Sequence, residues 1–354
     1  MRRVSLGRAQ PGIRVARTIF TLDGIILVPA GVQLTRELIH NLEHYGITEI
    51  YIDDKISEDI TYVETIKEEI LTDIKSQVKK IMTSPSIRMS VAGKKIENIV
   101  NKLLESILQK DNVIISLSDI RSVDDYTFSH SVNVSIFSLI TGITLGYKGE
   151  DLKGLGEGAL LHDIGKVLVS EDVLKKPSTL TAAEYEEVKR HTVYGYDILR
   201  NSGNISPICP IIALYHHERI DGSGYPYKLK DGDIPVSARI VAVSDVYDAL
   251  TTNRVYRKKI PSFEVLDYMC SLADRHFDKK VLKAFICHIA NYPVGTAVLL
   301  NSGEKGLISK YNPALPNKPI VKIVMDRNGK MLGQYKEVDL SRELRYSIAG
   351  LWNV

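Results

Sequence analysis

The arrangement of histidine and aspartate residues through the middle of the chain limits what it can fold into more than any other feature. Five histidines and two aspartates form two adjacent pairs and otherwise lie at least 25 residues apart: His130, His162, Asp163, His191, His216, His217 and Asp245. Residues so widely spaced belong to different elements, so they act together only if the fold brings them into one core. Imidazole and carboxylate are ligands that Fe, Mn, Zn and Ni accept, and a carboxylate can bridge two ions. The pattern indicates a metal-dependent hydrolase.

The composition predicts an ordinary intracellular protein with more than one hydrophobic core. The chain has 354 residues, of which 44% are hydrophobic and 25% are charged, which is enough for two or three cores. Its three cysteines, Cys209, Cys270 and Cys287, are odd in number and show no CxxC spacing. They predict neither a disulfide framework nor a thiolate zinc site, and they fit a reducing cytoplasm.

Membrane and nucleic-acid binding are not expected from the sequence. No run reaches the roughly 18 apolar residues that a membrane span needs. The basic start Met1-Arg2-Arg3 is not followed by the unbroken apolar stretch of a signal peptide. The formal net charge of +3 gives no general argument for DNA or RNA binding. We therefore expect a cytoplasmic protein with no membrane insertion and no nucleic-acid partner.

Changes in hydrophobic period divide the N-terminal third into two parts. Residues 1–56 hold short β-type runs and one helix near 35–45, which predicts a small α+β accessory module. Residues 57–118 are helical in pattern, with apolar residues every three or four positions from Ile60 to Ile81 and again from Ile96 to Leu108. The stripe over 60–81 either packs on its own chain or pairs two protomers as a homodimer, and both alternatives are open.

The rest of the chain is mostly helical and then turns to β structure. Within residues 119–290 a helix begins near His130, another helical segment ends at His162, and a further helix is expected over 182–200. Residues 291–354 contain β-type runs at 296–300, 306–308 and 320–324, which predict a small β-rich module. The fold class expected is predominantly α, with a helical bundle flanked by the two small modules. Ligands that come from several helices can converge in the core of such a bundle.

Several local motifs resemble those of one known family. His130-Ser131 is followed by the run HDIGK at 162–166, by His191, by HHERIDGSGYP at 216–226 and by Asp245. Between about residues 120 and 290 the chain resembles HD-GYP domains, the subgroup of HD-superfamily phosphohydrolases associated with cyclic di-GMP. The resemblance implies an HD-type helical bundle for the catalytic domain at 119–290.

The resemblance also implies two divalent metal ions, with Fe or Mn first and Ni or Zn as alternatives. One ion would lie among His130, His162, Asp163 and Asp245, and the second among His191, His216 and His217, with Asp163 bridging both. Two such ions can hold a hydroxide for attack at phosphorus. Asp163 and Lys166 are therefore the expected catalytic residues. The Lys166 ammonium would contact an oxygen of the phosphate, and a solvated surface lysine is the alternative.

Further residues are expected to contact substrate. Arg254 and Arg257 would bind phosphates, for which a planar guanidinium is suited, although a surface ion pair is the alternative. Gly222, Gly224 and Tyr225 belong to a turn that either faces substrate or serves only as a tight structural loop. Tyr225 would stack on guanine or act as a buried aromatic anchor, and the two are equally supported.

One departure from the family pattern bears on the number of metals. Some members carry a glutamate four residues before the first histidine, which supplies a third ion. Here that position is Tyr126, a poor substitute for a bridging carboxylate. The sequence therefore predicts a binuclear centre.

The activity implied by the resemblance is hydrolysis of cyclic di-GMP to pGpG, with continuation to GMP left open. The first alternative is hydrolysis of a related cyclic dinucleotide such as 3′,3′-cGAMP. The second is a signalling receptor that binds cyclic di-GMP without turnover. Retention of the complete ligand set together with Lys166 favours an enzyme.

Overall fold

The computed structural model describes residues 1–352 apart from 22–24, 62–63, 110–112, 116–125 and 253–259, and it describes only the backbone at 126–127. The chain forms two compact units. One comprises residues 1–72, 112–124 and 289–354, and the other comprises residues 73–111 and 125–288. We call them the terminal unit and the helical unit.

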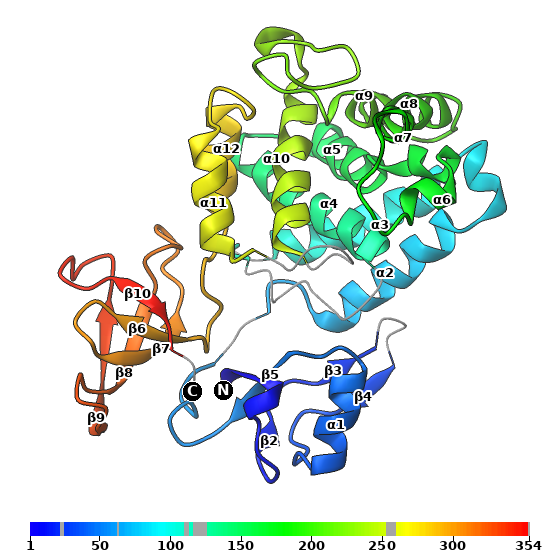
Figure 1. Ribbon diagram of the computed structural model, residues 1–354. Helices are drawn as coiled ribbons and strands as arrows, with labels where there is room; N and C mark the ends of the chain where they lie inside the picture. Colours follow the sequence, from blue (N-terminus) through cyan, green and yellow to red (C-terminus); the bar gives the residue numbers. More distant parts are fainter. Residues whose placement is uncertain (22–24, 62–63, 110–112, 116–125, 253–259, 353–354) are drawn as a thin grey trace. The chain divides into compact units, whose positions relative to one another are not determined.

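The helical unit is a bundle in which α4 lies against α5 and α10, while α5 and α8 lie against α9 (Figure 1). Its helices are α3 (Gly93–Leu108), α4 (Tyr126–Thr144), α5 (Gly149–Leu161), α6 (Glu171–Leu174), α7 (Ala182–Lys189), α8 (His191–Arg200), α9 (Ile208–Tyr215), α10 (Val236–Thr251), α11 (Ser262–Ser271) and α12 (Lys279–Ile286). Helices α4 and α10 are buried on nearly all sides, which explains why their sequences lack a polar face. The predominantly α fold class is confirmed.

Two helices differ from the sequence prediction. The apolar stripe that begins at Ile60 predicts a helix from that point, but α2 spans Glu68–Met82 and Ile60 instead belongs to the apolar core of the C-terminal sheet. The helix expected over 182–200 is two helices, α7 and α8, which end and begin on either side of Arg190. Apolar spacing alone carries no signal for such a change of direction.

The stripe on α2 is covered within the single chain. Ile74, Val78 and Ile81 are all buried. An amphipathic helix whose apolar residues are already covered presents no exposed seam to a second protomer. Packing within the chain thus accounts for the stripe, and a homodimer through residues 60–81 stays a prediction.

The N-terminal part of the terminal unit is a small α+β structure. Strands β1 (Arg2–Ser5), β5 (Glu49–Asp53) and β2 (Arg14–Val15) form an antiparallel sheet in that order, and β3 (Ile19–Phe20) pairs with β4 (Ile26–Val28). Helix α1 (Arg36–His44) begins after Thr35, whose side chain accepts a hydrogen bond from the Leu38 amide as an N-cap. The helix expected near 35–45 is therefore present.

The C-terminal part is a five-stranded antiparallel sheet in the order β10-β6-β7-β8-β9. Its strands are β6 (Ala297–Leu300), β7 (Lys305–Lys310), β8 (Ile320–Met325), β9 (Met331–Asp339) and β10 (Ile348–Leu351). The three expected β runs correspond to β6, β7 and β8. Strand β9 is mostly exposed, so it lacks the apolar alternation by which a sequence reveals a strand.

Contacts within the terminal unit join its two ends. The Arg3 amide donates to the carbonyl of Gly295 at 3.0 Å. The ammonium of Lys322, on β8, donates to the Ile56 carbonyl at 2.9 Å and also contacts the Asp59 carboxylate. Segments predicted as separate modules thus share one compact unit, and the boundaries at 56, 118 and 290 stay predictions.

In the portion of the chain that the structure describes, no helix has both the length and the apolar character that crossing a bilayer requires.

Candidate metal centre

Six elements of the helical unit bring the seven predicted ligands together. His130 lies in the second turn of α4 and Asp245 near the middle of α10. His162 and Asp163 fall between α5 and the short helix η4 (Ile164–Leu168). His191 lies at the start of α8, and His216 and His217 directly follow α9.

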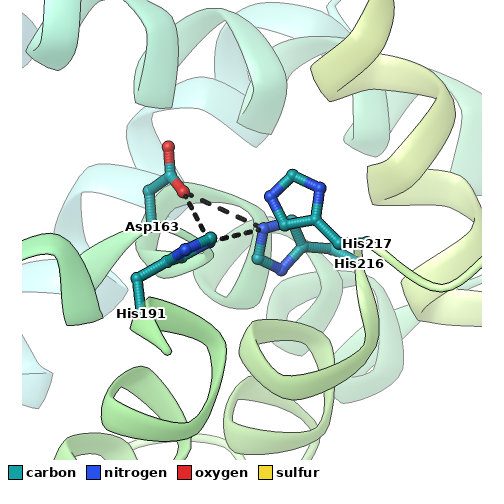
Figure 2. Close-up of side chains that lie close together, drawn as sticks. All are labelled: Asp163, His191, His216 and His217. Carbon is teal, nitrogen blue, oxygen red and sulfur yellow. Dashed lines mark hydrogen bonds and ion pairs between the residues drawn. The ribbon is translucent and has the colours of Figure 1, made fainter. Parts of the chain in front are cut away.

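The ligand atoms form two adjacent clusters. One contains Asp163, His191, His216 and His217, and its donor atoms all lie within 4.8 Å of one another; the other contains His130, His162 and Asp245 within the same limit. Figure 2 shows the first cluster, in which the rings of His191 and His216 and the carboxylate of Asp163 converge. The structure therefore brings together all seven residues predicted from the sequence, in the two groups that the resemblance implies.

Asp163 lies between the two clusters, with one carboxylate oxygen turned toward each. Its Oδ1 is 3.3 Å from Nε2 of His191 and 3.9 Å from Nε2 of His216. Its Oδ2 is 3.4 Å from Nε2 of His162 and 3.8 Å from Nε2 of His130. This is the arrangement by which one carboxylate can bridge two ions.

Three of the histidines are oriented by carbonyls of the backbone. Nδ1 of His162 lies 2.8 Å from the Ala159 carbonyl oxygen. Nδ1 of His191 lies 2.6 Å from the Val188 carbonyl oxygen, and Nδ1 of His216 lies 3.0 Å from the Ala213 carbonyl oxygen. A carbonyl can only accept, so Nδ1 carries the proton and Nε2 carries the lone pair. Each Nε2 therefore faces the cluster as a potential metal ligand.

His130 is oriented by a carboxylate instead. Its Nδ1 lies 2.7 Å from Oδ2 of Asp248, and Oδ1 of Asp248 accepts a hydrogen bond from the side-chain amide of Asn133 at 2.9 Å. Sequence reasoning gave neither Asp248 nor Asn133 a role. The available signal was their spacing, because each follows a predicted ligand by three residues on a helix and so shares its face.

The residues present fit divalent metal ions. Nε2 of His162 and Oδ1 of Asp163 are buried without a hydrogen-bond partner among the described residues. Burying unpaired polar atoms is costly, and a cation between them would satisfy both. The donor set of imidazole nitrogens and carboxylate oxygens suits Fe, Mn, Ni and Zn. The clusters can therefore hold metal ions, with the number and identity of the ions left to the proposal below.

The protonation states follow from burial and from neighbouring charges. Burial lowers the pKa of His191 to about 4 and the pKa values of His216 and His217 well below the usual range. Burial opposes ionisation of Asp163, but the Lys166 ammonium and the neighbouring histidines outweigh it and lower its pKa. Neutral imidazoles and an ionised carboxylate are the forms that coordinate metals.

His130 differs in its protonation. Burial would lower its pKa, but hydrogen bonds to Asp245 and Asp248 outweigh that effect and raise the pKa to about 9. In the metal-free protein this imidazole therefore keeps its proton at neutral pH, and a metal ion that binds Nε2 displaces it.

Gly165 allows the HDIGK segment (residues 162–166) to pack closely against the backbone of α8 at His191. A Cβ atom at this position would lie 1.9 Å from the His191 carbonyl oxygen and 2.4 Å from the Gly195 nitrogen. Because both of these are backbone atoms, no larger residue allows η4 and α8 to approach so closely. The close approach places Asp163, two residues earlier, beside the ring of His191.

Lys166 lies beside Asp163, the carboxylate between the two clusters. Its ammonium contacts Oδ2 of Asp163, and its side chain is 35% exposed. The structure thus places Lys166 at the ligands, with part of its side chain accessible from solvent. Its expected contact with substrate stays a prediction.

The 222–226 turn is built around the backbone that follows the adjacent histidines. Gly222 has a φ of +80°. A Cβ at Gly224 would lie 2.5 Å from the His217 carbonyl oxygen. Tyr225 stacks on His217, with ring centroids 4.6 Å apart. These contacts supply structural reasons for the three residues, and their substrate contacts stay predictions.

Glu218 holds the same loop and was also missed from the sequence. Its carboxylate is buried and accepts hydrogen bonds from the amides of Tyr227 at 2.7 Å and Leu229 at 2.9 Å. A buried acidic residue next to a metal ligand is a signal for such a role.

Two sets of predictions fall outside the described residues. Arg254 and Arg257 lie in 253–259, and the side chain of Tyr126 is likewise not described. Both the phosphate contacts of the arginines and the inference of a binuclear centre from Tyr126 therefore stay predictions.

Comparison with known protein families agrees with this geometry. Residues 127–281 match the HD domain model, and residues 297–353 match the model of a KOW domain associated with HD domains. The cyclic di-GMP phosphodiesterase PA4108 of Pseudomonas aeruginosa is 35% identical over 245 residues, which cover 69% of this chain and 59% of that protein. The chain belongs to the HD-GYP family.

Other relatives of this HD-GYP protein differ in the substrate given by their names. A cyclic di-GMP phosphodiesterase of Thermotoga maritima is 37% identical over 177 residues, covering 49% of this chain and 47% of that protein. The 3′3′-cGAMP-specific phosphodiesterase 2 of Vibrio cholerae is 32% identical over 163 residues, covering 46% and 31%. The HD-GYP chain thus spans less than two thirds of the length of each of these relatives.

Proposed function

We propose that the protein is a metal-dependent phosphodiesterase that hydrolyses cyclic di-GMP to linear pGpG. The observation that carries the proposal is the position of Asp163, whose two oxygens face two separate clusters of buried imidazoles and carboxylate. A bridging carboxylate between two ligand clusters is characteristic of centres that catalyse displacement at phosphorus. The names of the relatives in Pseudomonas aeruginosa and Thermotoga maritima support this substrate.

Two divalent ions, with Fe or Mn first and Ni or Zn as alternatives, would supply activation of water and neutralisation of phosphate charge. His130, His162, Asp163 and Asp245 would hold one ion, and His191, His216 and His217 would hold the other together with Asp163. The backbone carbonyls behind the rings of His162, His191 and His216 fix their directions before any ion binds.

Among the described residues, Lys166 has a cation beside Asp163 that is placed to meet the anionic phosphate. Its ammonium is held next to Asp163, while 35% of the side chain is exposed to solvent. A cation held at this position can donate hydrogen bonds to an oxygen of the phosphodiester and stabilise the charge that develops there. Lys166→Arg, which keeps the charge and changes its geometry, separates a purely electrostatic role from a positional one.

Hydrolysis of 3′,3′-cGAMP is a second candidate function. It is favoured by the relatives in Vibrio cholerae whose names describe them as 3′3′-cGAMP-specific phosphodiesterases. Cyclic di-GMP and 3′,3′-cGAMP share the cyclic backbone with its two phosphodiesters and differ in one base, so the metal centre alone does not select between them. The ratio of kcat/KM values for the two nucleotides measures the selection directly.

The test is an assay of purified protein loaded with Mn²⁺ or Fe²⁺ under reducing conditions. Each cyclic dinucleotide is added separately, and linear dinucleotide and mononucleotide products are separated by chromatography. We expect pGpG from cyclic di-GMP, and the time course shows whether GMP follows. Asp163→Ala is the inactive control. Metal-loaded protein that binds cyclic di-GMP but releases neither product would overturn the enzyme proposal and support a receptor.

Metal content is a separate measurement. Elemental analysis of protein purified without added metal gives the identity and the number of bound ions. Two ions per chain agree with the proposal, and a third would contradict the inference drawn from Tyr126.

A further inference from the structure

Two facing helices carry a second pair of residues directly behind the ligands His130 and Asp245. On α4, Asn133 follows His130 by three residues, and on α10, Asp248 follows Asp245 by three residues. Residues three apart share one face of a helix. The ligand pair and the pair behind it therefore face each other across the same contact between α4 and α10.

Asp248 lies in the interior with both oxygens engaged. It is 0% exposed, and its oxygens contact Nδ1 of His130 at 2.7 Å and the Asn133 amide at 2.9 Å. On its other side, the His130 ring presents Nε2 to Oδ1 of Asp245 at 3.2 Å. A carboxylate thus stands directly behind a ring whose far nitrogen faces the metal cluster.

This arrangement distinguishes His130 from three other ligand histidines. The rings of His162, His191 and His216 are held by neutral carbonyls three residues before them, in each case from nearby backbone. His130 is held by a charged group from another helix. A buried carboxylate is costly to desolvate, so packing alone gives no reason for one at this position.

We propose that Asp248 is a positioning residue that fixes the ring of His130 with Nε2 toward the metal and strengthens that nitrogen as a ligand, and that Asn133 holds Asp248 in place. The proposal rests on the metal binding in the proposed function and goes beyond it by assigning the support of one ligand.

The physical reason is the charge of Asp248. A carboxylate that accepts the Nδ1 proton fixes the tautomer and draws the N–H toward itself, which makes the opposite nitrogen a stronger electron donor. A neutral carbonyl does this more weakly. An ion at His130 would therefore gain stronger support than backbone carbonyls give to His191 and His216 in the other cluster.

Asp248→Asn is the variant that removes the charge and keeps the shape. The new amide oxygen can still accept from His130, and its NH₂ group would then face Asn133. The side-chain oxygen of Asn133 is buried without a hydrogen-bond partner in the described structure, so rotation of that amide can supply the acceptor. The substitution therefore tests the charge without opening a cavity.

Ser138→Ala is the matched control. The Ser138 hydroxyl donates to the Ser244 hydroxyl at 3.1 Å, and both side chains are buried. This hydrogen bond also joins α4 to α10, and within the described part of the chain it involves no ligand histidine. If Asp248 only ties the two helices together, Ser138→Ala should imitate its loss.

The experiment measures metal binding. Metal-free wild type, Asp248→Asn and Ser138→Ala are titrated with Mn²⁺ by calorimetry, and thermal unfolding of each metal-free protein reports its fold. We expect the weakest Mn²⁺ site of Asp248→Asn to lose about 10- to 100-fold in affinity, as for other residues behind metal ligands, while Ser138→Ala stays within about twofold of wild type. Equal losses in both variants, or no loss in Asp248→Asn, would overturn the proposal.

Two further measurements keep the test decisive. If Asp248→Asn fails to fold, Asn133→Ala takes its place, and an Mn²⁺ affinity equal to that of wild type would then count against the proposal. Turnover is assayed separately with the wild type. A wild type that binds Mn²⁺ but hydrolyses no cyclic dinucleotide would refute the proposed function, whereas the Asp248→Asn titration would still decide the role of Asp248.

Discussion

Both units of the molecule bury apolar side chains, but they differ in the ionisable side chains that they bury. At the centre of the helical unit lie imidazoles and carboxylates, among them His162, His216 and Asp248, all fully buried. The terminal unit instead has two apolar cores, one under the C-terminal sheet and one among β1, β5 and α1. Buried ionisable groups are costly, whereas apolar burial stabilises a fold. The difference indicates that the buried ionisable groups of the site lower the stability of the helical unit, whereas the terminal unit carries no such cost at its two apolar cores.

Asp163→Ala is the change with the largest expected effect on activity. It removes both oxygens that link the clusters, so we expect kcat/KM to fall at least about 10³-fold, which corresponds to about 4 kcal/mol. Asp163→Asn, which keeps the shape, should be nearly as inactive because an amide does not bridge two cations. Product formation is measured in parallel with thermal unfolding of the metal-free protein. More than a tenth of wild-type activity in either variant would refute the bridging role.

The pH dependence of stability tests the cost of the polar core. In the metal-free protein, burial holds the pKa of His191 near 4, below its unfolded value of about 6.5. Between these values the unfolded chain binds the proton and the folded one does not. Stability should therefore fall as pH drops from about 6.5 to 4, by up to about 3 kcal/mol from this residue alone.

The pH dependence of stability that His130 contributes has the opposite sign. Its folded pKa of about 9 lies above the unfolded value, so its contribution is present below about pH 6.5 and is lost as pH rises through 9. Urea unfolding of chelated protein across this range should show greatest stability near pH 6.5. A flat profile would contradict the assigned protonation states. Added Mn²⁺ should raise stability more as the pH rises toward 9, because the proton on His130 then competes less for that ligand.

Leu300→Ala probes the other side of the comparison. Leu300 is 1% exposed and belongs to the apolar core under the C-terminal sheet. Removing its side chain leaves a cavity and should destabilise the terminal unit by about 2–3 kcal/mol. Because Leu300 belongs to the terminal unit and the ligands belong to the helical unit, kcat/KM of the folded protein should stay within about twofold. A large loss of turnover in folded protein would show that the units are functionally coupled.

The residues that form the two clusters could be predicted from the sequence, whereas the residues that orient them could not. His162 and His216 belong to sequence motifs that resemble those of the HD-GYP family, and these motifs indicate metal ligands. The spacing of Asp248 shows only that it shares a helix face with Asp245. Its contact with His130 depends on the distance from α10 to α4, which helical periodicity does not encode. The loop carboxylate of Glu218 was missed for the same reason, since its partners are backbone amides.

The prediction of the fold succeeded where a regular apolar pattern coincided with one element, and it failed where the pattern extended past an element or was missing. Ile60 continues the spacing of the helical stripe yet packs in the core under the C-terminal sheet, because an apolar residue fits either environment. The end of α7 at Lys189 and the start of α8 at His191 lack a glycine or proline to mark the break. Strand β9 is mostly exposed, so its sequence resembles a loop.

Among the described residues of the terminal unit, Lys322 is a charged side chain that is buried, and loss of its ion pair with Asp59 has the smallest expected effect. Its side chain is 4% exposed, while its partner Asp59 is 62% exposed. Asp59→Ala removes a largely solvated carboxylate and leaves the ammonium with the Ile56 carbonyl and the Tyr335 ring, whose centroid is 4.3 Å away. Because Asp59 is largely exposed, solvent screens its charge, and we expect a loss of about 1 kcal/mol in urea unfolding and no change in turnover. Lys322→Met should be close to neutral, because an apolar side chain of similar length avoids the desolvation of a buried charge. A loss from Lys322→Met as large as that from Leu300→Ala would mean that the terminal unit also depends on a buried charge, and the contrast between the two units would then fail.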